Sequence, residues 1–518
     1  MSASLQLALA DIFQWQSLLS ILFGTAAGII IGDLPGLSTV MGLSILLPFT
    51  FGMSGFQGIL MLLGVFCGGI YGGSISAILI NTPGTSASAA TTLDGHPMAV
   101  KMRQPGRALG ISTFSSLFSG IFSCIMLIIF GQLLAKVALV FSAQEYFALA
   151  VFGITLVTSL SSTSVIKGLI SAVIGLLLAT VGMEGLSGQN RFTFDSVYLM
   201  GGISFIPLLI GLYAFAQNLK TIEGIDENHG MKNRIKVEHV LPSKNDLKTI
   251  FPTVLMSSTI GTFIGAVPGT GGDIASWVCY SQAKRISKHP EKFGHGAPEG
   301  IAASESGNNA ISGGAFIPLL SLGIPGDAGT AVMLGSLTML GIQPGPLLFT
   351  EHADIAYEIF VGLLIANIFM GILGFSCIRF FAKVIDIPNR ILLPVIFCLC
   401  CVGTFACNNS IEDVFLMIIV GVAGFFLIKF DYPAPPMVLG LILGGMIEKN
   451  FRRGLILSNG DPTTFFRRPV SCLFLILALI SVFEPVIQNA FKKKRGKGSM
   501  VNEILEEIQG GQEEEEKR

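Results

Sequence analysis

Long apolar segments, many of them interrupted by Gly and Pro, occupy most of this chain of 518 residues. A helix that crosses a bilayer needs roughly 20 mainly apolar residues, and such segments recur between residues 15 and 490. Only 13% of the residues are charged, whereas a soluble protein has about 25%. We therefore expect an all-α polytopic membrane protein with about 10–13 transmembrane helices, together with re-entrant or broken helices.

The same composition argues against several classes of function. The formal net charge is −1, so the chain has no basic surface of the kind that binds nucleic acid. Walker A and nucleophile-elbow patterns are absent and the acids are scattered singly, so we do not expect an enzyme. The cysteines near residue 400 have no histidines at metal-ligand spacing, so neither a metal nor a cofactor is expected. The first Lys or Arg is Lys101, so no cleavable signal with a basic leader is expected.

Basic residues are concentrated in five stretches, which are 92–107, 217–250, 284–299, 448–468 and the segment from residue 492 onward. Lys and Arg are enriched in cytoplasmic loops, so we expect all five on the cytoplasmic face. The chain is then divided into an N-terminal segment 1–14, a first transmembrane repeat 15–216, a cytoplasmic linker 217–250, a second transmembrane repeat 251–447, a cytoplasmic basic loop with a final helix 448–491, and a charged cytoplasmic tail 492–518.

Two signatures occur twice in the chain, in the same order. The pattern GxxxGxxPG begins at Gly28 and again at Gly261, and a Gly-Gly pair precedes a second Pro-Gly at Pro83 and at Pro325. The offset between the halves is 233 residues for the first Pro-Gly and 242 for the second. This agreement indicates an internal duplication.

The basic residues indicate how the two copies are oriented. Between the first Pro-Gly and the Gly-Gly pair, the first half has no Lys or Arg, whereas the second half has four. After the second Pro-Gly the bias is reversed, with Lys101, Arg103 and Arg107 in the first half and only acids in the second half as far as residue 358. Equivalent loops should therefore lie on opposite faces. This predicts two inverted-topology repeats, as in many secondary transporters.

The Pro-Gly pairs predict breaks in membrane helices. Proline removes an amide donor and glycine permits turns, and the freed backbone is tolerated only where it is buried in protein or lines a cavity. Helix N-termini carry positive partial charge that suits a carboxylate. We expect a substrate site at the bilayer midplane, with cavity backbone from Pro35, Gly36, Pro268 and Gly269 and substrate contacts from Pro83, Gly84, Pro325 and Gly326.

Short polar side chains near these breaks are the candidate substrate-binding residues. They are Asn81, Thr82, Thr85, Ser86, Asn308, Asn309 and Thr330. Ser and Thr also pack helices together as interhelical donors. Packing is therefore favoured for any single hydroxyl, whereas a binding role is favoured for the asparagines.

Four acids near the breaks are candidates for binding a coupling ion. They are Asp33, Asp273, Glu305 and Asp327. Ionisable groups at membrane depth are costly and indicate function by default. The alternatives are a helix N-cap or a position shallow enough to reach water. Capping is slightly favoured for Asp327 because it follows Pro325-Gly326 directly.

The motifs around the breaks allow a comparison with a known family. They include Gly72-Gly73-Ser74, Asn81-Thr82-Pro83-Gly84-Thr85-Ser86, Leu93-Asp94-Gly95-His96-Pro97, Glu305-Ser306-Gly307-Asn308-Asn309-Ala310 and Leu322-Gly323-Ile324-Pro325-Gly326. In this combination the chain resembles the large transmembrane subunit of the tripartite tricarboxylate transporters. The similarity covers roughly residues 15–450.

This resemblance implies a bacterial inner-membrane uptake system that is driven by a sodium or proton gradient and not by ATP. It implies two partners, a small membrane subunit and a periplasmic solute-binding protein, and a tricarboxylate or other small carboxylate as substrate. The alternative function is an ion or anion channel, or a uniporter, that works without a binding protein. The sequence predicts no oligomeric state.

Overall fold

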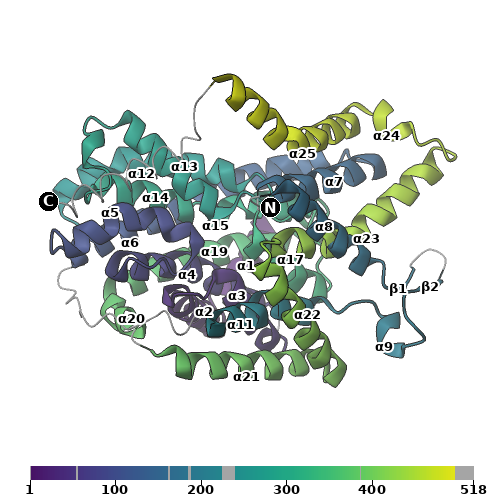
Figure 1. Cartoon of the computed structure of the whole chain (residues 1–518), viewed down its shortest axis with the longest axis horizontal. Coiled ribbons are helices and arrows are strands. Elements are labelled where there is room, and N and C mark those ends of the chain that lie inside the picture. The colour runs from purple at the N-terminus through teal and green to yellow at the C-terminus, as the bar shows by residue number, and fades with distance from the viewer. Residues whose placement is uncertain are drawn as a thin grey trace.

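The computed structural model describes residues 2–53, 56–160, 164–184, 188–223, 240–385 and 387–495. Its first half contains α1 (Ser2–Ile12), α2 (Trp15–Asp33), α3 (Thr39–Thr50), α4 (Gln57–Ile80), η1 (Ser86–Ser88), α5 (Ala89–Val100), α6 (Pro105–Ala138), α7 (Ala143–Leu160), α8 (Val165–Ala179), β1 (Gly182–Met183), β2 (Asn190–Arg191), α9 (Val197–Met200), α10 (Phe205–Leu209), η2 (Ile210–Phe215) and α11 (Ala216–Glu223). Figure 1 shows these elements packed with those of the second half in one helical body.

The second half contains α12 (Lys244–Gly265), α13 (Gly271–Ile286), η4 (Pro290–Lys292), α14 (Pro298–Asn309), α15 (Ile311–Gly314), α16 (Phe316–Leu322), α17 (Ala328–Met339), α18 (Leu348–Glu351), α19 (Ala353–Ser376), α20 (Ile378–Val384), α21 (Asn389–Asn408), α22 (Ile411–Lys429), α23 (Ala434–Leu457), α24 (Thr464–Arg467) and α25 (Pro469–Arg495). Residues 224–239 of the expected linker and 496–518 of the expected tail lie outside the described residues.

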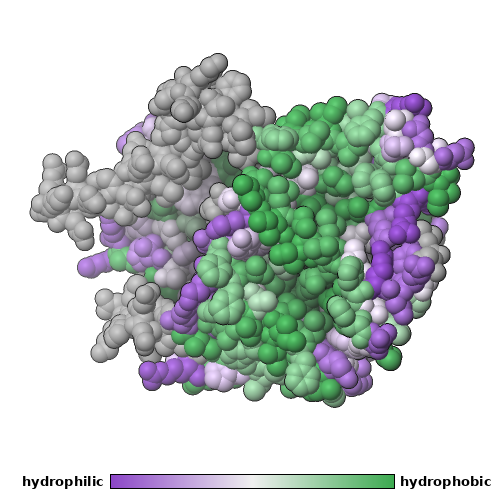
Figure 2. Space-filling view, turned by 45° about the vertical axis from the view of Figure 1, so that its right-hand side comes forward, coloured by the Kyte–Doolittle hydropathy of each residue, from purple (hydrophilic) through white to green (hydrophobic). Residues whose placement is uncertain are grey.

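Apolar helices dominate the described part of the chain. Eight of them are long and apolar enough to cross a membrane, and shorter apolar helices such as α3, α8 and α17 accompany them. Figure 2 shows a broad hydrophobic band on one face of the molecule, with hydrophilic residues gathered at its margins. The prediction of an all-α polytopic membrane protein is confirmed.

Matched glycine contacts confirm the internal duplication. A Cβ atom added to Gly72 would clash with the carbonyl oxygen of Ile29, and one added to Gly314 would lie 2.7 Å from the carbonyl oxygen of Thr262. Ile29 and Thr262 are related by the offset of the first Pro-Gly, and the two glycines by the offset of the second. The same close helix crossing therefore occurs in both halves, between α2 and α4 and between α12 and α15.

The first Pro-Gly break of each half turns the chain back into a hairpin. Gly24 and Gly32 of α2 pack against Met61 and Gly69 of α4 in that order, so α2 and α4 run parallel. The intervening α3 must run in the opposite direction and forms a hairpin with α2. Gly261 and Gly265 of α12, which match Gly28 and Gly32, contact Gly307 of α14 and Gly314 of α15 in the same order. Thus α12 and α13 form a second hairpin.

Asn367 of α19 marks one level in the packed core. Its Nδ2 atom lies 3.5 Å from the Cys67 sulfur of α4 and 3.5 Å from the Ser312 hydroxyl oxygen of α15. The same nitrogen also lies 3.6 Å from the Cys124 sulfur of α6. These three helices therefore meet at the same height.

A second level lies nearer the start of α6. The Ser74 and Ser112 hydroxyls are 2.9 Å apart, and the Ser116 hydroxyl, one turn further along α6, donates to Glu305 at 3.1 Å. From the level of Asn367 to this second level, residue numbers increase along α4, from Cys67 to Ser74. Along the α14–α15 segment they decrease, from Ser312 to Glu305. Because these are equivalent helices of the two repeats, the repeats are inverted, as the distribution of basic residues predicted.

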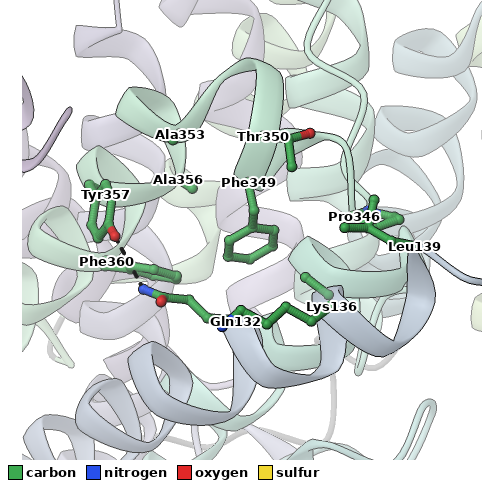
Figure 3. A pocket seen from close by; sticks show the side chains of 11 residues that line it. Gln132, Lys136, Leu139, Pro346, Phe349, Thr350, Ala353, Ala356, Tyr357 and Phe360 are labelled. Atoms are coloured by element: carbon green, nitrogen blue, oxygen red, sulfur yellow. Dashed lines mark hydrogen bonds between the residues drawn. The ribbon is translucent and has the colours of Figure 1, made fainter. Parts of the chain in front are cut away.

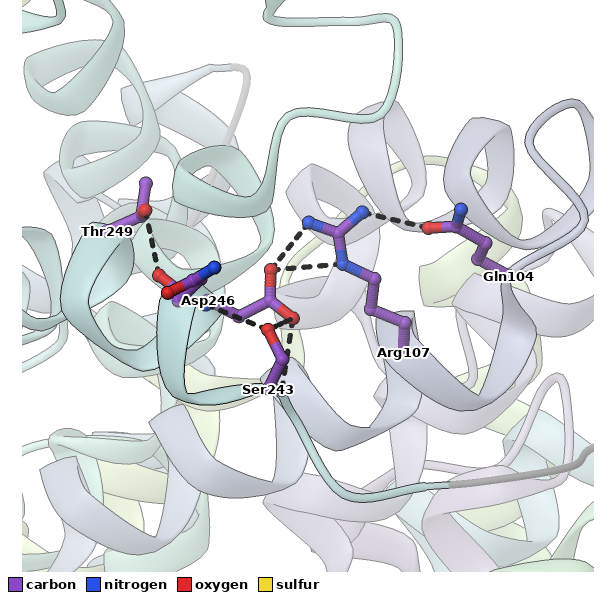
Figure 4. A network of polar contacts seen from close by, with 6 residues as sticks. Gln104, Arg107, Ser243, Asp246 and Thr249 are labelled. Carbon is purple, nitrogen blue, oxygen red and sulfur yellow. Dashed lines mark hydrogen bonds and ion pairs between the residues drawn. The ribbon is translucent and has the colours of Figure 1, made fainter.

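The basic stretches 92–107 and 284–299 lie together at the start of α6. The backbone N–H of Gly294 donates to Asp94 of α5 at 2.9 Å. Figure 4 shows Arg107 at the first turn of α6 bonded to Asp246 at the first turn of α12, with 3.1 Å between Nε and Oδ1. These stretches and the start of α12 therefore share one end of the molecule.

The basic stretch 448–468 lies at the other end of α6. Arg468 Nε is 2.8 Å from Glu145 Oε1, and Glu145 lies just beyond the end of α6, a helix of 34 residues and about 50 Å. The expectation that 448–468 faces the cytoplasm together with 92–107 is therefore wrong. At that end Arg468 and Arg452 form ion pairs with Glu145 and Glu184, so part of the positive charge of the stretch is balanced locally.

Candidate functional site

The second Pro-Gly break of each half is followed by a helix that begins in the same way. Thr85 and Ser88 form a reciprocal capping box at η1, and Asp327 and Thr330 form one at α17. Thr85 and Asp327 are separated by the repeat offset of 242 residues. The Thr330 N–H donates to Asp327 Oδ1 at 2.7 Å. The structure therefore shows that Asp327 is a helix N-cap, the role that the sequence slightly favoured. Thr330 forms the other half of the same capping box.

Helix starts from the two repeats meet at a bridge between Ser86 and Asp273. The Ser86 hydroxyl donates to Asp273 Oδ1 at 2.8 Å, and both side chains are exposed. A Cβ atom added to Gly271 would lie 3.9 Å from Asp327 Cβ, so the starts of α13 and α17 are adjacent as well. We call Ser86, Gly271, Asp273 and Asp327 the helix-start junction.

The start of α3 completes this arrangement. Ser38 caps α3 by accepting a hydrogen bond from the Met41 N–H at 3.1 Å, and α3 packs against α17. By the inverted symmetry this pair is equivalent to α13 and η1. Each repeat therefore contributes two helices to these contacts between the repeats.

The breaks themselves are held inside the protein by backbone contacts. The Gly269 N–H donates to the Gly326 carbonyl at 2.7 Å, and the Gly84 N–H donates to the Gly73 carbonyl at 3.2 Å. A Cβ atom at Gly84 would clash with the Gly32 carbonyl oxygen. The prolines of the breaks are partly buried at Pro35, Pro83 and Pro268 and fully buried at Pro325. The backbone at Gly84, Gly269 and Gly326 is therefore bonded within the protein.

Glu305 and Asn309 lie apart from the helix-start junction, in a buried interface between α14, α5 and α6. Thr91 donates to Glu305 Oε1 at 2.5 Å, and Ser116 donates to Oε2 at 3.1 Å. Asn309 Nδ2 donates to the Ser116 hydroxyl oxygen at 2.8 Å. Glu305 and Asn309 are 0% and 1% exposed. This polar cluster joins the two repeats.

Asn308 links that interface to the helix-start junction. Its Nδ2 donates to the Ile70 carbonyl of α4 at 3.3 Å. Its Oδ1 is so close to Gly272 that a Cβ atom there would clash with it. Gly272 is the residue before Asp273, so the buried Asn308 supports the start of α13 from behind.

Asn81 and Thr82 form an exposed turn after α4. Asn81 ends the helix in the left-handed conformation with φ of 56°, and its counterpart Gly323 ends α16 in the same way with φ of 73°. The Thr82 hydroxyl donates to the nearby Ile80 carbonyl at 3.3 Å. The structure thus gives Asn81 a helix-ending position at the edge of the junction.

Asp33 is separated from the helix-start junction. It ends α2 against α4, where a Cβ atom at Gly72 would lie 3.0 Å from the Asp33 backbone nitrogen. Its side chain is 0% exposed, and neither carboxyl oxygen has a hydrogen-bond partner among the described residues. Of the four predicted acids, only Asp273 and Asp327 are brought together.

Tyr213 is a candidate site residue that was not predicted from the sequence. This residue lies on η2, a π-helical segment, and such segments are frequent at functional sites. Its hydroxyl is buried without a partner among the described residues, and it is close enough to Asp327 to be influenced by its charge. No motif singles out Tyr213, because this residue lies within an apolar span far from any Pro-Gly pair.

The residues that form the helix-start junction include two carboxylates and no basic side chain. Attraction of an anion would therefore depend on the backbone N–H groups and dipoles of the helix starts. Asp273 and Asp327 would suit a cation, or a hydroxyl group on the ligand. In the described parts of the chain, no group of three or more His, Cys, Asp or Glu could hold a metal ion.

A separate pocket of about 140 Å³ lies at the far end of α6 (Figure 3). Gln132 and Lys136 of α6 line one side of it, and Phe349 and Tyr357 line the other. Gln132 Nε2 donates to the Tyr357 hydroxyl at 3.4 Å. This pocket is at the same end of α6 as the 448–468 stretch and contains none of the predicted site residues.

Comparisons with known proteins agree with this architecture. Residues 18–439 match the family model described as "Tripartite tricarboxylate transporter TctA family". An uncharacterized 52.8 kDa protein in the TAR-I ttuC′ 3′ region of Agrobacterium vitis is 38% identical over 472 residues, which are 91% of this chain and 93% of the relative. An uncharacterized protein in the TAR-II ttuC′ 3′ region of the same organism is 37% identical over 234 residues, which are 45% of this chain and 97% of that relative. No solved structure matches the chain.

Proposed function

Because the chain belongs to the tripartite tricarboxylate transporter TctA family, we propose that it is the large membrane subunit of a binding-protein-dependent secondary transporter that imports tricarboxylates or other small carboxylates. The observation that carries this proposal is the meeting of helix starts from both inverted repeats at Ser86 and Asp273. Backbone N–H groups at helix starts bind carboxylates even where no basic side chain is present. Inverted repeats around such a site are typical of secondary transporters.

Matched positions that differ in exposure support alternating access. Thr82 is exposed, whereas Ile324, 242 residues later, is 0% exposed. Asn81 and Gly323 show the same contrast. One break is therefore open while its symmetry mate is closed, as expected of a carrier that faces one side at a time. The open break follows α4 beside the basic stretch 92–107, so we assign this structure to an inward-facing state.

We assign the substrate to the helix-start junction and the backbone beside it. Ser86 and the backbone N–H groups of the first residues of η1 and α17 would contact the carboxylates, with Thr85 and Thr330 holding the two helix starts in place. The exposed turn at residues 81–82 would line the route to the cytoplasm. The buried Asn308, Asn309 and Glu305 would hold the repeats in register.

The partners and the energy source belong to the same proposal. The family description implies a tripartite system, which would add a small membrane subunit and a periplasmic solute-binding protein in a bacterial inner membrane. The linker 217–250 and the tail would face the cytoplasm. Import would be driven by a sodium or proton gradient, with Asp33, Asp273, Glu305 and Asp327 as the candidate coupling residues.

Counterflow tests this function against the channel alternative. The full complex, with small subunit and binding protein, is reconstituted in liposomes loaded with unlabelled citrate and diluted into trace labelled citrate. A carrier exchanges the two and accumulates label transiently above equilibrium. A channel lets the label equilibrate without an overshoot, and that outcome would support the alternative.

A matched pair of asparagine variants tests the site. Asn308→Ala removes the amide that supports the start of α13, and we expect counterflow to be lost while membrane expression is kept. Asn450→Ala is the control, because among the described residues the Asn450 side chain of α23 donates only to the Met446 carbonyl of its own helix. Equal counterflow in both variants would contradict the assignment of Asn308.

A further inference from the structure

Asp33 differs from the other acids near the breaks. Glu305, Asp273 and Asp327 each accept at least one hydroxyl hydrogen bond. Asp33 is 0% exposed, and both of its carboxyl oxygens lack hydrogen-bond partners among the described residues. An ionised carboxylate in such a place costs several kcal/mol. The Asp33 carboxylate is therefore stable in this position only when a positive charge neutralises it.

The groups on α4 and α20 do not supply that charge. From α4, the backbone N–H of Ser76 is a nearby donor but does not reach hydrogen-bonding geometry with either Asp33 oxygen, and the Tyr71 side chain lies close by. The Tyr71 hydroxyl is already paired, at 2.7 Å, with a threonine of α6. α20 carries Arg379 and Lys383, but both are exposed on the side of the helix away from the core.

The remaining neighbours of α2 are neutral or acidic. α3 contains no titratable side chain. Asp11 of α1 and Glu358 of α19 lie close enough for their charges to interact, near the start of α2. Asp33 is the last residue of α2, a whole helix length away. Glu305 of α14 is close enough to Tyr71 to be influenced by the same surroundings, and it is also acidic.

A proton fits this environment better than a sodium ion. A hard cation is held by about six oxygen ligands, and no hydroxyl of the described residues is in hydrogen-bonding geometry with either Asp33 oxygen. A proton needs only one oxygen of the carboxylate itself. The hydroxyl-rich surroundings of Asp273 and Glu305 would suit sodium better.

Asp33 also lies beside the second Pro-Gly break of the first repeat. The neighbouring Gly32 carbonyl is packed so tightly against Gly84 that a Cβ atom there would clash with it. Gly84 lies two residues before Ser86 of the helix-start junction. Displacement of this break during transport would therefore change the surroundings of Asp33.

We propose that Asp33 is the proton-binding site through which substrate import is coupled to a proton gradient. The inference rests on the proposed function as a carrier. In the outward-facing state a proton from the external water forms an O–H bond with one carboxylate oxygen. The structure, assigned above to an inward-facing state, holds Asp33 away from water, so release follows a displacement of the break at Gly84 that admits cytoplasmic water. The O–H bond then breaks, the proton passes to that water and the carboxylate is restored. No oxidant, reductant or further group takes part.

Asp33→Asn separates coupling from transport. Asparagine resembles the protonated acid in shape and charge, but it cannot release a proton. In liposomes with the full complex, we expect citrate counterflow within about twofold of wild type and accumulation driven by a pH gradient reduced to the equilibrium level. Wild-type counterflow should fall as the pH rises on both sides, whereas counterflow by Asp33→Asn should not change.

Three arms complete the experiment. Asp33→Glu keeps a titratable group and should keep accumulation driven by a pH gradient. Glu358→Gln removes another acid that is 7% exposed, and it should behave as wild type. A sodium gradient at equal pH should drive no accumulation by the wild type.

Several outcomes would overturn the proposal. They are accumulation by Asp33→Asn under a pH gradient, loss of its counterflow in a protein that is monodisperse and normally folded, wild-type accumulation driven by sodium alone, or equal uncoupling by Glu358→Gln. Absence of counterflow in the wild-type complex would instead contradict the proposed function. The two failures are therefore distinguishable.

Discussion

The Ser86 hydroxyl of the first repeat donates to the Asp273 carboxylate of the second at 2.8 Å. A hydrogen bond to a charged group contributes about 1.5 kcal/mol or more, and less where water competes. For this exposed pair we expect about 1 kcal/mol, so Ser86→Ala should raise the KM for uptake by about fivefold. Ser86→Thr keeps the hydroxyl and should stay near wild type. Initial rates of labelled citrate uptake measure both variants, and an unchanged KM in Ser86→Ala would show that the bridge does not contribute.

The exposed turn of the first repeat should react from the cytoplasmic side. In a background without the exposed Cys398, Thr82→Cys should be labelled rapidly by an impermeant maleimide in inside-out vesicles. Ile324→Cys is the symmetry-matched control and should be protected, because Ile324 is 0% exposed. Substrate and binding protein that drive the carrier outward should reduce the difference. Equal labelling of the two positions would contradict the inward-facing assignment.

Gly84 should not tolerate a side chain. A Cβ atom there would clash with the Gly32 carbonyl, which is backbone and cannot rotate away. We expect Gly84→Ala to lose at least 90% of uptake activity, since overpacking of this kind costs about 1–3 kcal/mol or more. Gly445→Ala is the matched control, because nothing lies within 4 Å of a Cβ atom at Gly445 of α23. Normal uptake by Gly84→Ala would mean that the break can move aside freely.

Asp94 should be a main determinant of stability. Its Oδ1 accepts backbone N–H bonds from Gly294, Gly296 and Ala297 at 2.7–2.9 Å, and its Oδ2 accepts the Tyr280 hydroxyl at 2.9 Å. Asp94→Ala leaves these buried donors unpaired and should cost about 3–5 kcal/mol. Tyr280→Phe removes one bond and should cost about 1 kcal/mol.

Thermal unfolding followed with a thiol-reactive dye measures these variants, because Cys67, Cys124 and Cys279 are buried and become reactive on unfolding. The unfolding temperature should fall by several degrees for Asp94→Ala and by much less for Tyr280→Phe. The reverse order, or no change for Asp94→Ala, would show that the loop at residues 294–297 is held by other contacts.

The two ends of α6 should be labelled from opposite faces. Lys101 is exposed near the start of α6, and Arg453 is exposed in the stretch beside its far end. An impermeant maleimide added to intact spheroplasts should label Arg453→Cys but not Lys101→Cys, and inside-out vesicles should give the reverse. Labelling of both variants from one side would mean that the helices between them do not cross the bilayer.

Sequence alone was sufficient for the features that depend on local chemistry. Long apolar runs predicted a membrane protein. The offsets of the Pro-Gly pairs, together with the reversed distribution of basic residues, predicted an inverted duplication. The contacts of Asn367 and Glu305 confirm that duplication. The capping of α17 by Asp327 could also be predicted from the sequence, because an acid directly after Pro-Gly is a helix-start signal. These features are local or periodic, so one sequence contains them.

Tertiary structure decided which residues meet. Ser86 and Asp273 are 187 residues apart, and no periodicity predicts that their helix starts converge while Asp33 and Glu305 are drawn into separate buried environments. The position of 448–468 beside Glu145 and Glu184 depends on how distant helices pack, which a statistical bias in charge cannot anticipate. Burial and pairing arise from contacts between distant segments, and only the folded chain determines which polar groups are satisfied and which, like the carboxyl group of Asp33, are not.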